Sequence, residues 1–459
     1  MKGSRGVIDF FLALVFAMST SGSVRAEEDV RKMIEDMRAQ IEFLTNRVNE
    51  LEKQVQTENK KKEPLPKQTA DAPAEDQPKP VTVGDIKGAY KIPGTDTSLA
   101  VGGYVKLDAI YNSVSVGGSG GSNNADYFLV ASSIPVGDRD AEDDQVTFHA
   151  RESRFWLKSH TPTDRGPLGT YLELDFFAFQ APGDERVSNS FAPRLRHAYG
   201  QWGHFLAGQT WSTFMNVAAL PELNDFGGPV GRVFVRQPQI RWTQPLMSGD
   251  LRSDMQFALE APESTLTDSL GMRVTPDDDR VPDTIVRVNL AGAFGEVSLA
   301  GMLRQIRSDS GGNGDEAFGG AINLTGRINT TDLDTLRFMF AYGNALGRYT
   351  TLNLFNDGAI DANGNIELFN VYNGVLAYQH WWSPNWRSTL AVGIARAGDY
   401  PDFVPETVSK EARSVHVNLL WSPLLQTTFG LEYIFARREL DNGDAGDLHR
   451  VQFSSRINF

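Results

Sequence analysis

Arg194-Leu-Arg-His-Ala-Tyr-Gly-Gln-Trp-Gly-His-Phe-Leu-Ala-Gly-Gln-Thr-Trp211 is the stretch that decides the fold. Its aromatic and aliphatic residues alternate with polar or small ones, and glycines bracket the segment Gly200-Gln-Trp-Gly203. This pattern is typical of two short antiparallel strands joined by a tight turn. We therefore expect a β-hairpin here, with its turn at Gly200–Gly203.

The segment that follows, Ser212-Thr-Phe-Met-Asn-Val-Ala-Ala-Leu-Pro-Glu-Leu-Asn-Asp-Phe-Gly-Gly-Pro-Val-Gly231, has no regular periodicity. Loops of this length inside a domain are usually functional. Its apolar residues can pack against a wall, and its carboxylates Glu222 and Asp225 can bind basic groups. These features favour a loop that folds into a wide pore and narrows it. The alternative is a surface loop that packs only on its own side chains.

Alternation with a period of two residues recurs from Leu99 to the C-terminus, in sixteen segments. In one of them, Leu172 and Leu174 lie on one face of the strand, whereas Glu173 and Asp175 lie on the other. Each segment therefore has an apolar face and a polar face. A soluble β-sandwich would show the same alternation, so the lengths of the connections must separate the two folds.

The predicted connections alternate between short and long. Short turns are expected after Leu157, Tyr199, Trp242, Leu290, Ile328, His380 and Leu420. Long loops are expected after Tyr111, Phe179, Trp211, Glu260, Ile306, Tyr342, Ala395 and Arg438. Tryptophans accompany the short turns at positions 202, 242, 381, 382, 386 and 421. Turns at one end, loops at the other and an aromatic girdle indicate an all-β fold: a transmembrane antiparallel β-barrel of about sixteen strands over residues 96–459.

The N-terminal region predicts export. Residues 1–26 combine Lys2 and Arg5 with an apolar core and end in Val24-Arg-Ala26, which is typical of a secretory signal peptide. In residues 27–58, apolar positions spaced alternately four and three predict a short α-helical coiled coil in the periplasm. Its branched a positions with Leu at d favour a dimer, and the alternative is a single amphipathic helix lying on another domain. The Pro-, Lys- and Asp-rich residues 59–95 predict a linker.

Composition excludes several classes of function. The chain of 459 residues has no Cys, so it has neither a disulfide framework nor a thiolate metal site. Its formal net charge of −14 gives no support to a nucleic-acid partner. The seven His residues are scattered without a catalytic or metal-binding spacing. We therefore expect no enzyme activity, cofactor or metal, and no ligand-loop pattern supports calcium binding.

Three groups of motifs resemble the DcaP-like family of trimeric outer-membrane porins. They are Tyr90–Leu99 with Gly103–Asp108, Ser153–Phe155 with Thr161–Thr163, and Leu195–Gly200 with Gly208–Phe214. The resemblance covers nearly the whole mature chain. It implies a sixteen-stranded barrel, three barrels per assembly, a third extracellular loop that folds inward, and uptake of small anions such as dicarboxylates. A homotrimer differs from the dimer that the heptads favour, and here the barrel overrules the four heptads.

Strand parity places many arginines in the lumen. The candidates for an anion-selective constriction are Arg154, Arg194, Arg196, Arg241, Arg252 and Arg304, with Glu222 and Asp225 on the loop. A guanidinium binds a carboxylate through two parallel hydrogen bonds and stays charged. The alternative is that these arginines pair with lumen carboxylates such as Glu173, Asp175, Asp254 and Glu260 only to stabilise a polar interior.

Two functions from different classes remain. The first is a porin in the outer membrane of a Gram-negative bacterium, embedded in its lipid and selective for small anionic solutes such as dicarboxylates. The second is a structural anchor, tethered towards the peptidoglycan by the coiled coil of residues 27–58, with a non-selective pore. The arginines and the loop at 212–231 favour the porin.

Overall fold

The computed structural model describes residues 82–115, 125–137, 143–177, 191–309 and 314–459. The predicted signal peptide at 1–26 and coiled coil at 27–58 lie outside the described residues, as does the linker up to residue 81. Within the described residues, no helix has the length and apolar character needed to cross a membrane.

Twenty-two strands and three described 3₁₀ helices make up this part of the chain. The strands of the large sheet are β1 (Ala89–Lys91), β2 (Ser98–Val114), β3 (Asp143–His149), β4 (Arg154–Thr161), β5 (Leu168–Asp175), β6 (Arg194–Trp202), β7 (Phe205–Trp211), β8 (Arg236–Met247), β9 (Arg252–Glu260), β12 (Asp283–Gly292), β13 (Gly295–Ser308), β14 (Asp315–Asn329), β15 (Thr335–Asn344), β18 (Asn370–Ser383), β19 (Trp386–Ala397), β20 (Ser409–Leu424), β21 (Thr427–Leu440) and β22 (Ala445–Asn458). The smaller elements are β10 (Leu266–Thr267), β11 (Arg273–Val274), β16 (Gly358–Ile360), β17 (Ile366–Leu368), η1 (Ala131–Ser133), η2 (Val217–Ala219) and η4 (Gly347–Tyr349).

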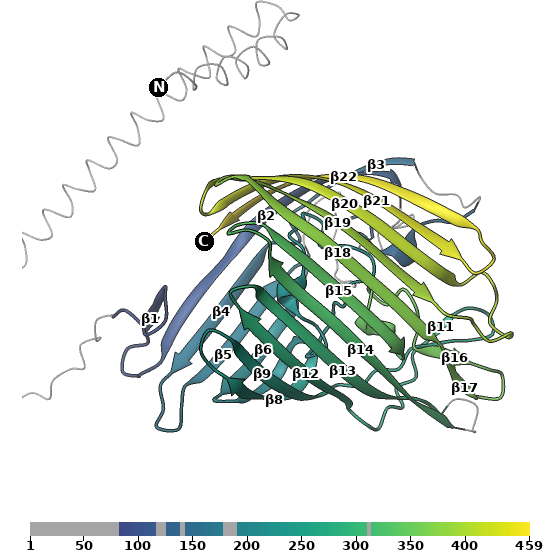
Figure 1. Cartoon of the computed structure of the whole chain (residues 1–459), viewed down its shortest axis with the longest axis horizontal. Helices are drawn as coiled ribbons and strands as arrows, with labels where there is room; N and C mark the ends of the chain where they lie inside the picture. The colour runs from purple at the N-terminus through teal and green to yellow at the C-terminus, as the bar shows by residue number, and fades with distance from the viewer. Residues whose placement is uncertain (1–81, 116–124, 138–142, 178–190, 310–313) are drawn as a thin grey trace, which may run out of the picture. The chain divides into compact units, whose positions relative to one another are not determined.

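The large sheet closes on itself as an antiparallel barrel (Figure 1). The last strand, β22, pairs with β2 from Tyr104↔Asn458 to Asn112↔Arg450. β3 and β4 pair with successive parts of β2, so together they occupy one position in the wall. β1 is an addition beside the first part of β2. The wall therefore has sixteen positions, which confirms the predicted fold class.

The two faces of the wall differ in polarity as the alternation predicts. Several outward apolar side chains are more than half exposed: Val105, Phe148, Leu303, Phe318, Ile322 and Leu431. The inward face carries charged and amide side chains, and Arg196, Arg304 and Arg450 are the largest fully buried side chains among the described residues. An apolar outer surface around a polar interior is the arrangement of an outer-membrane barrel.

One end of the barrel, which we call the turn end, has the short connections and the C-terminus. The hairpin between β6 and β7 turns at Gly203-His204 rather than at Gly200–Gly203, because β6 continues through Trp202 and Gly203 takes the left-handed φ of 54°. Trp202, Trp242 and Trp382 stand beside these turns with exposed fractions of 46%, 48% and 65%. Their exposure matches an aromatic girdle.

The opposite end, the loop end, is less uniform than predicted. The long loops expected after Ile306 and Arg438 are wrong, because β13 pairs with β14 as far as Ser308↔Asp315 and β21 with β22 as far as Glu439↔Ala445. Cross-strand ion pairs support these extensions, and the pairs Arg307–Glu316 and Arg437–Asp447 each measure 3.1 Å. Opposite charges facing each other stabilise a sheet. The polar residues at these positions therefore extend the strands and do not form long loops.

Two further segments differ from a plain barrel. Within the predicted linker 59–95, β1 pairs with β2 in the register Ala89↔Ala100, so part of that range is a strand. At the loop end, β10, β11, β16 and β17 form a small sheet of their own. Phe214 and Tyr349 belong to one apolar core, with ring centroids 5.8 Å apart.

Candidate functional site

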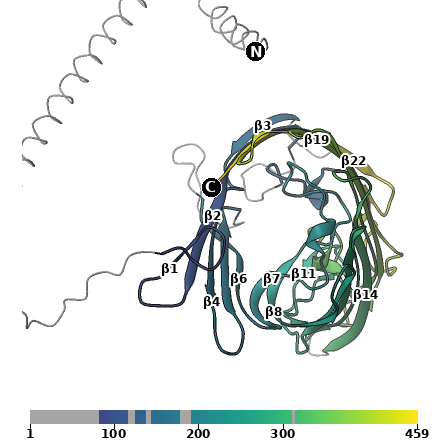
Figure 2. The same cartoon turned by 60° about the vertical axis from the view of Figure 1, so that its left-hand side comes forward.

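The connection between β7 and β8, residues 212–235, lies against the inner wall of the barrel (Figure 2). Asn323 of β14 donates to the Phe214 carbonyl at 2.8 Å, and Arg337 of β15 donates to the Leu220 carbonyl at 2.9 Å. Further along, Asn418 of β20 donates to the Glu222 carbonyl at 2.9 Å. The loop thus follows the wall in barrel order, because side chains of the wall satisfy its backbone groups.

The two carboxylates of the loop form ion pairs with arginines of the barrel wall. Glu222 accepts hydrogen bonds from Arg387 Nε at 2.7 Å and from Gln379 at 2.6 Å. Asp225 pairs with the fully buried Arg450 at 2.9 Å. Both carboxylates are predicted to bind basic groups, and in the structure their partners are Arg387 and Arg450. The loop also extends to Val235, four residues beyond the predicted end at Gly231, because β8 begins only at Arg236.

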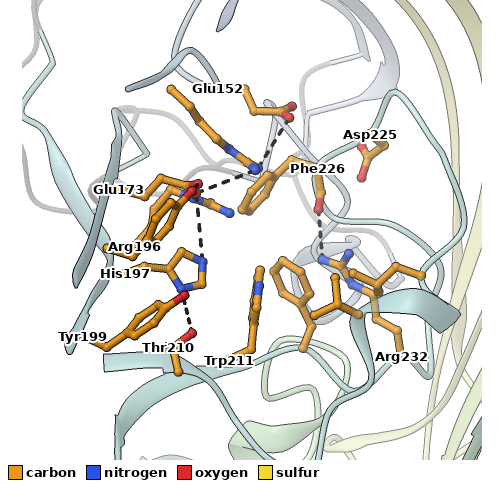
Figure 3. A pocket seen from close by; sticks show the side chains of 15 residues that line it. Glu152, Glu173, Arg196, His197, Tyr199, Thr210, Trp211, Asp225, Phe226 and Arg232 are labelled. Atoms are coloured by element: carbon orange, nitrogen blue, oxygen red, sulfur yellow. Dashed lines mark hydrogen bonds and ion pairs between the residues drawn. The ribbon is translucent and has the colours of Figure 1, made fainter. Parts of the chain in front are cut away.

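A cavity of about 410 Å³ separates this loop from the wall formed by β4–β7 (Figure 3). The wall contributes charged and aromatic side chains, and the loop contributes Val217, Leu220, Asp225, Phe226 and Arg232. Figure 3 shows Glu173, Arg196 and His197 on one side of the cavity and Phe226 and Arg232 on the other. The cavity is therefore bounded by the wall strands on one side and by the inward loop on the other.

Arg194 and Arg196 are held by carboxylates of the neighbouring strand β5. Arg194 makes two hydrogen bonds to Asp175, at 2.8 and 2.7 Å. Arg196 bridges Glu173 at 2.5 Å and Asp175 at 2.7 Å, and only 1% of its side chain is exposed. Such pairs match the alternative in which lumen arginines only stabilise a polar interior. The charge of these two arginines is closely compensated by carboxylates.

Three other arginines keep much more of their charge available. Arg154 approaches Glu152 and Glu173 only at 3.8 Å. Arg232 donates to the Phe226 carbonyl at 2.9 Å, and Nη1 of Arg236 has no hydrogen-bond acceptor among the described residues. Neither Arg232 nor Arg236 forms an ion pair with a carboxylate that the structure describes. The cavity and its rim thus have three guanidinium groups without a described carboxylate at hydrogen-bonding distance.

Aromatic rings support these guanidinium groups. Arg232 lies over the ring of Phe234 at 3.7 Å, and Arg236 lies over Trp211 at 4.6 Å. Cation–π contact stabilises a cation without cancelling its charge, unlike pairing with a carboxylate. The rings therefore position the arginines and leave their N–H groups able to bind an anion.

The remaining predicted arginines lie elsewhere. Arg241 lies on β8, paired in register with Leu206 and Ala258, and does not line the cavity. Arg252 is exposed at the start of β9, at the turn end. Arg304 is fully buried at the loop end, 3.1 Å from Asp283 and 2.5 Å from Asp357. The structure therefore brings Arg154, Arg194 and Arg196 together and leaves the other three apart.

Sequence reasoning missed several residues of this region. Arg232 and Arg236 follow directly after the predicted loop, and Val-Phe-Val separates them. A pair of arginines four residues apart at the end of an inward loop was the signal that could have found them. Tyr171 and Glu152 were also missed: Tyr171 donates to Glu173 at 2.6 Å, and Glu152 comes from the irregular break between β3 and β4. The described residues contain no His, Cys, Asp and Glu group suited to a metal ion.

Comparisons with known proteins agree with this architecture. A family model described as DcaP outer membrane protein matches residues 25–459. The chain is similar in structure to the outer membrane channel DcaP of Acinetobacter baumannii, with 21% identity and a TM-score of 0.67 over 79% of this chain and 97% of that one. An anion-selective porin from Comamonas acidovorans is also similar, with 13% identity and a TM-score of 0.47 over 79% of this chain and 100% of that one. So is the trimer form of OmpT from Vibrio cholerae, with 10% identity and a TM-score of 0.46 over 79% and 99%. No curated protein matches by sequence.

Proposed function

The chain belongs to the DcaP outer membrane protein family, and we propose that its channel admits small anionic solutes, dicarboxylates or related organic acids, through an arginine-lined constriction. It is an outer-membrane porin of that family. The proposal concerns what the pore selects, and it rests on one observation. Arg154 and Arg232 line the cavity of about 410 Å³ and Arg236 lies over the lining residue Trp211, all three without a carboxylate at hydrogen-bonding distance.

Charge-assisted hydrogen bonds explain how such a cavity favours anions. A carboxylate accepts two parallel N–H bonds from one guanidinium, and bonds of this kind are roughly twice as strong as neutral ones. Arg154 faces the cavity from β4, whereas Arg232 faces it from the loop. A dicarboxylate between them can exchange water for guanidinium at both ends, and a neutral sugar cannot.

The acidic total of the chain does not oppose this selectivity. The formal net charge is −14, but at physiological ionic strength exposed charges are screened over about 8 Å. Asp277 is one of the exposed carboxylates in the loop before β12. Charged groups that line the cavity therefore act on a passing ion more strongly than charged groups on the outer loops.

The test is the flux of succinate against that of a neutral sugar of similar size into liposomes that contain the full mature protein. Arg236→Gln should lower succinate flux about threefold to tenfold and leave sugar flux within about twofold, since only the anion loses a charge-assisted bond. The matched control is Arg396→Gln, because Arg396 is exposed and lies on the outward face of β19. An unchanged ratio of succinate to sugar flux in Arg236→Gln would contradict the arginine-based selectivity.

Assembly and orientation are further parts of the proposal. We place the turn end and the N-terminal segment in the periplasm, and we expect a homotrimer that forms mainly through the barrel walls. The heptads of residues 27–58 support a second role as a tether towards peptidoglycan. Deletion of residues 27–62 should leave a trimer in detergent, measured by native mass, and recovery of monomers or dimers would contradict assembly through the walls.

A further inference from the structure

Arg327 and Arg337 form a pair of like charges that the sheet places directly opposite each other. They are register partners of β14 and β15, in the third pair counted from the turn Thr330-Thr-Asp-Leu-Asp334. Their same-face neighbours Thr325 and Met339 are buried, so both arginines belong to the inward face. Like charges facing each other across two strands destabilise a sheet. A barrel that keeps such a pair needs a reason for it.

No carboxylate of the described residues neutralises this pair by a direct contact. Glu296 of β13 is the register partner of Arg327 on the other side, yet it forms no ion pair with it among the described residues. Arg337 binds only neutral acceptors, the Leu220 carbonyl at 2.9 Å and Gln379 at 3.4 Å. The nearby loop carboxylate, Glu222, is already bound to Arg387.

A third arginine also binds the inward loop near η2. Arg287 of β12 donates to the Met215 carbonyl, just before η2, as Arg337 donates to the Leu220 carbonyl just after it. The Nε atoms of Arg287, Arg327 and Arg337 are buried and have no acceptor among the described residues. The three guanidinium groups therefore carry more donors than the loop uses.

Support of the inward loop explains only two of these three arginines. Arg287 and Arg337 support the loop, and one hydrogen bond each satisfies its carbonyls. A neutral Gln could serve as such a donor without placing a positive charge opposite another. Arg327 makes no hydrogen bond to the loop in the described residues, so support of the loop does not account for it.

We propose that Arg327 and Arg337 form a second oxyanion site, which takes one carboxylate of a small organic acid after it leaves the cavity. This inference rests on the proposed function and deepens it. Leu220 lines the cavity with its side chain and accepts from Arg337 with its carbonyl, so the site adjoins the cavity across η2. A carboxylate bound between two guanidinium groups also relieves their mutual repulsion. The pair therefore lowers the barrier between cavity and turn end.

The experiment measures block of KCl current by succinate, added to one side of a planar bilayer that contains the full mature protein. Succinate that binds in the lumen interrupts chloride current, and the concentration for half block reports its binding. Arg327→Gln should raise this concentration about threefold to tenfold. Arg337→Gln should raise it similarly, and Arg396→Gln, on the outward face, should leave it unchanged. Arg327→Lys keeps the charge without the bidentate fork and should restore part of the block.

The outcomes separate this site from the proposed function. If succinate blocks the wild type, Arg236→Gln weakens the block and both Arg327→Gln and Arg337→Gln leave it unchanged, the second site is wrong and the constriction stands. If succinate does not block the wild type and its current shows no preference for anions, both proposals are wrong. Heat-modifiable mobility of each variant on a gel verifies that its barrel is folded, and Arg327→Gln is the decisive variant because Arg327 makes no bond to the loop.

Discussion

Arg304 and Arg236 both lie inside the barrel, and their surroundings differ in one respect. Arg304 is 1% exposed and lies between Asp283 and Asp357, whereas Arg236 lies on the face of Trp211 with no carboxylate bound to it. The first arrangement neutralises the positive charge inside the protein, and the second does not. The side chain that accompanies an arginine, rather than its position in the lumen, therefore determines whether its charge is compensated within the protein.

The largest expected effect comes from removal of Arg304. Arg304→Met leaves Asp357 buried without its cation and leaves Asp283 with only Arg348 at 3.3 Å, and breaking a buried pair in this way costs about 3–5 kcal/mol. The free energy of unfolding, from urea titration in detergent, should fall by that amount, and Arg396→Met should change it by less than about 1 kcal/mol. Equal stability of the two variants would contradict the stabilising role of Arg304.

A second prediction moves the loop without replacing any arginine. A Cβ added to Gly393 of β19 would overlap the Val230 carbonyl oxygen, so Gly393→Ala must push the loop and Arg232 away from the wall. Single-channel conductance should rise and preference for anions should fall. Gly301→Ala is the control, since nothing lies within 4 Å of its added Cβ. Unchanged conductance in Gly393→Ala would mean that the loop does not bound the narrow zone.

A third prediction compares two arginines of the same cavity. Arg154→Gln should lower the permeability ratio of chloride to potassium about twofold to fivefold with little loss of stability, because its carboxylates are 3.8 Å away. Arg196→Gln removes the buried cation that bridges Glu173 and Asp175 and leaves Asp175 with Arg194, so it should lower the free energy of unfolding by about 2–4 kcal/mol. Reversal potentials and urea titration measure the two effects. The same stability loss in both variants would contradict the distinction.

The smallest effect concerns pH. Burial opposes ionisation of Glu222, but the hydrogen bonds and charge of Arg387 outweigh it and hold the pKa of this carboxyl below its usual value. Since the folded-state pKa is depressed, the stabilisation is present above the ordinary Glu value of about 4.3 and is lost as the pH falls through the lower folded value. The contact between Glu222 and Arg387 should therefore hold the loop against the wall from pH 7 down to about 4.5. The noise of the channel current should stay low over this range and increase only at lower pH, where the loop is released. Glu222→Gln should be noisier at pH 7, and noise that begins near neutrality in the wild type would contradict the assignment.

Much of this fold was predictable from sequence, because alternation and turn chemistry are local. The barrel, its sixteen wall positions and the turns with their tryptophans follow from the period of two and from short Gly- and Pro-containing connections. The errors after Ile306 and Arg438 have a physical cause. Charged residues there pair across strands, as Arg307 does with Glu316, so polarity did not mark the end of the strand.

The site was less predictable than the fold. The alternation along a strand predicts whether a side chain points inward or outward, but it does not predict which residue the side chain contacts. Arg304 and Arg154 have the same inward parity, but Arg304 meets Asp357, which is 53 residues away in the chain. Arg236 was missed because the loop was ended at Gly231, before the chain reaches β8. Which carboxylate accompanies each arginine depends on the path of a loop that contacts wall strands from β14 to β22. No local pattern encodes that path.

The most direct test of the arginine-lined passage is the reversal potential of the wild-type protein in a planar bilayer across a tenfold gradient of KCl at pH 7. The net charge of −14 favours potassium, whereas Arg154, Arg232 and Arg236 beside the narrow cavity favour chloride. We predict a reversal potential of the sign set by chloride permeation. A reversal potential of the opposite sign, set by potassium, would contradict the account.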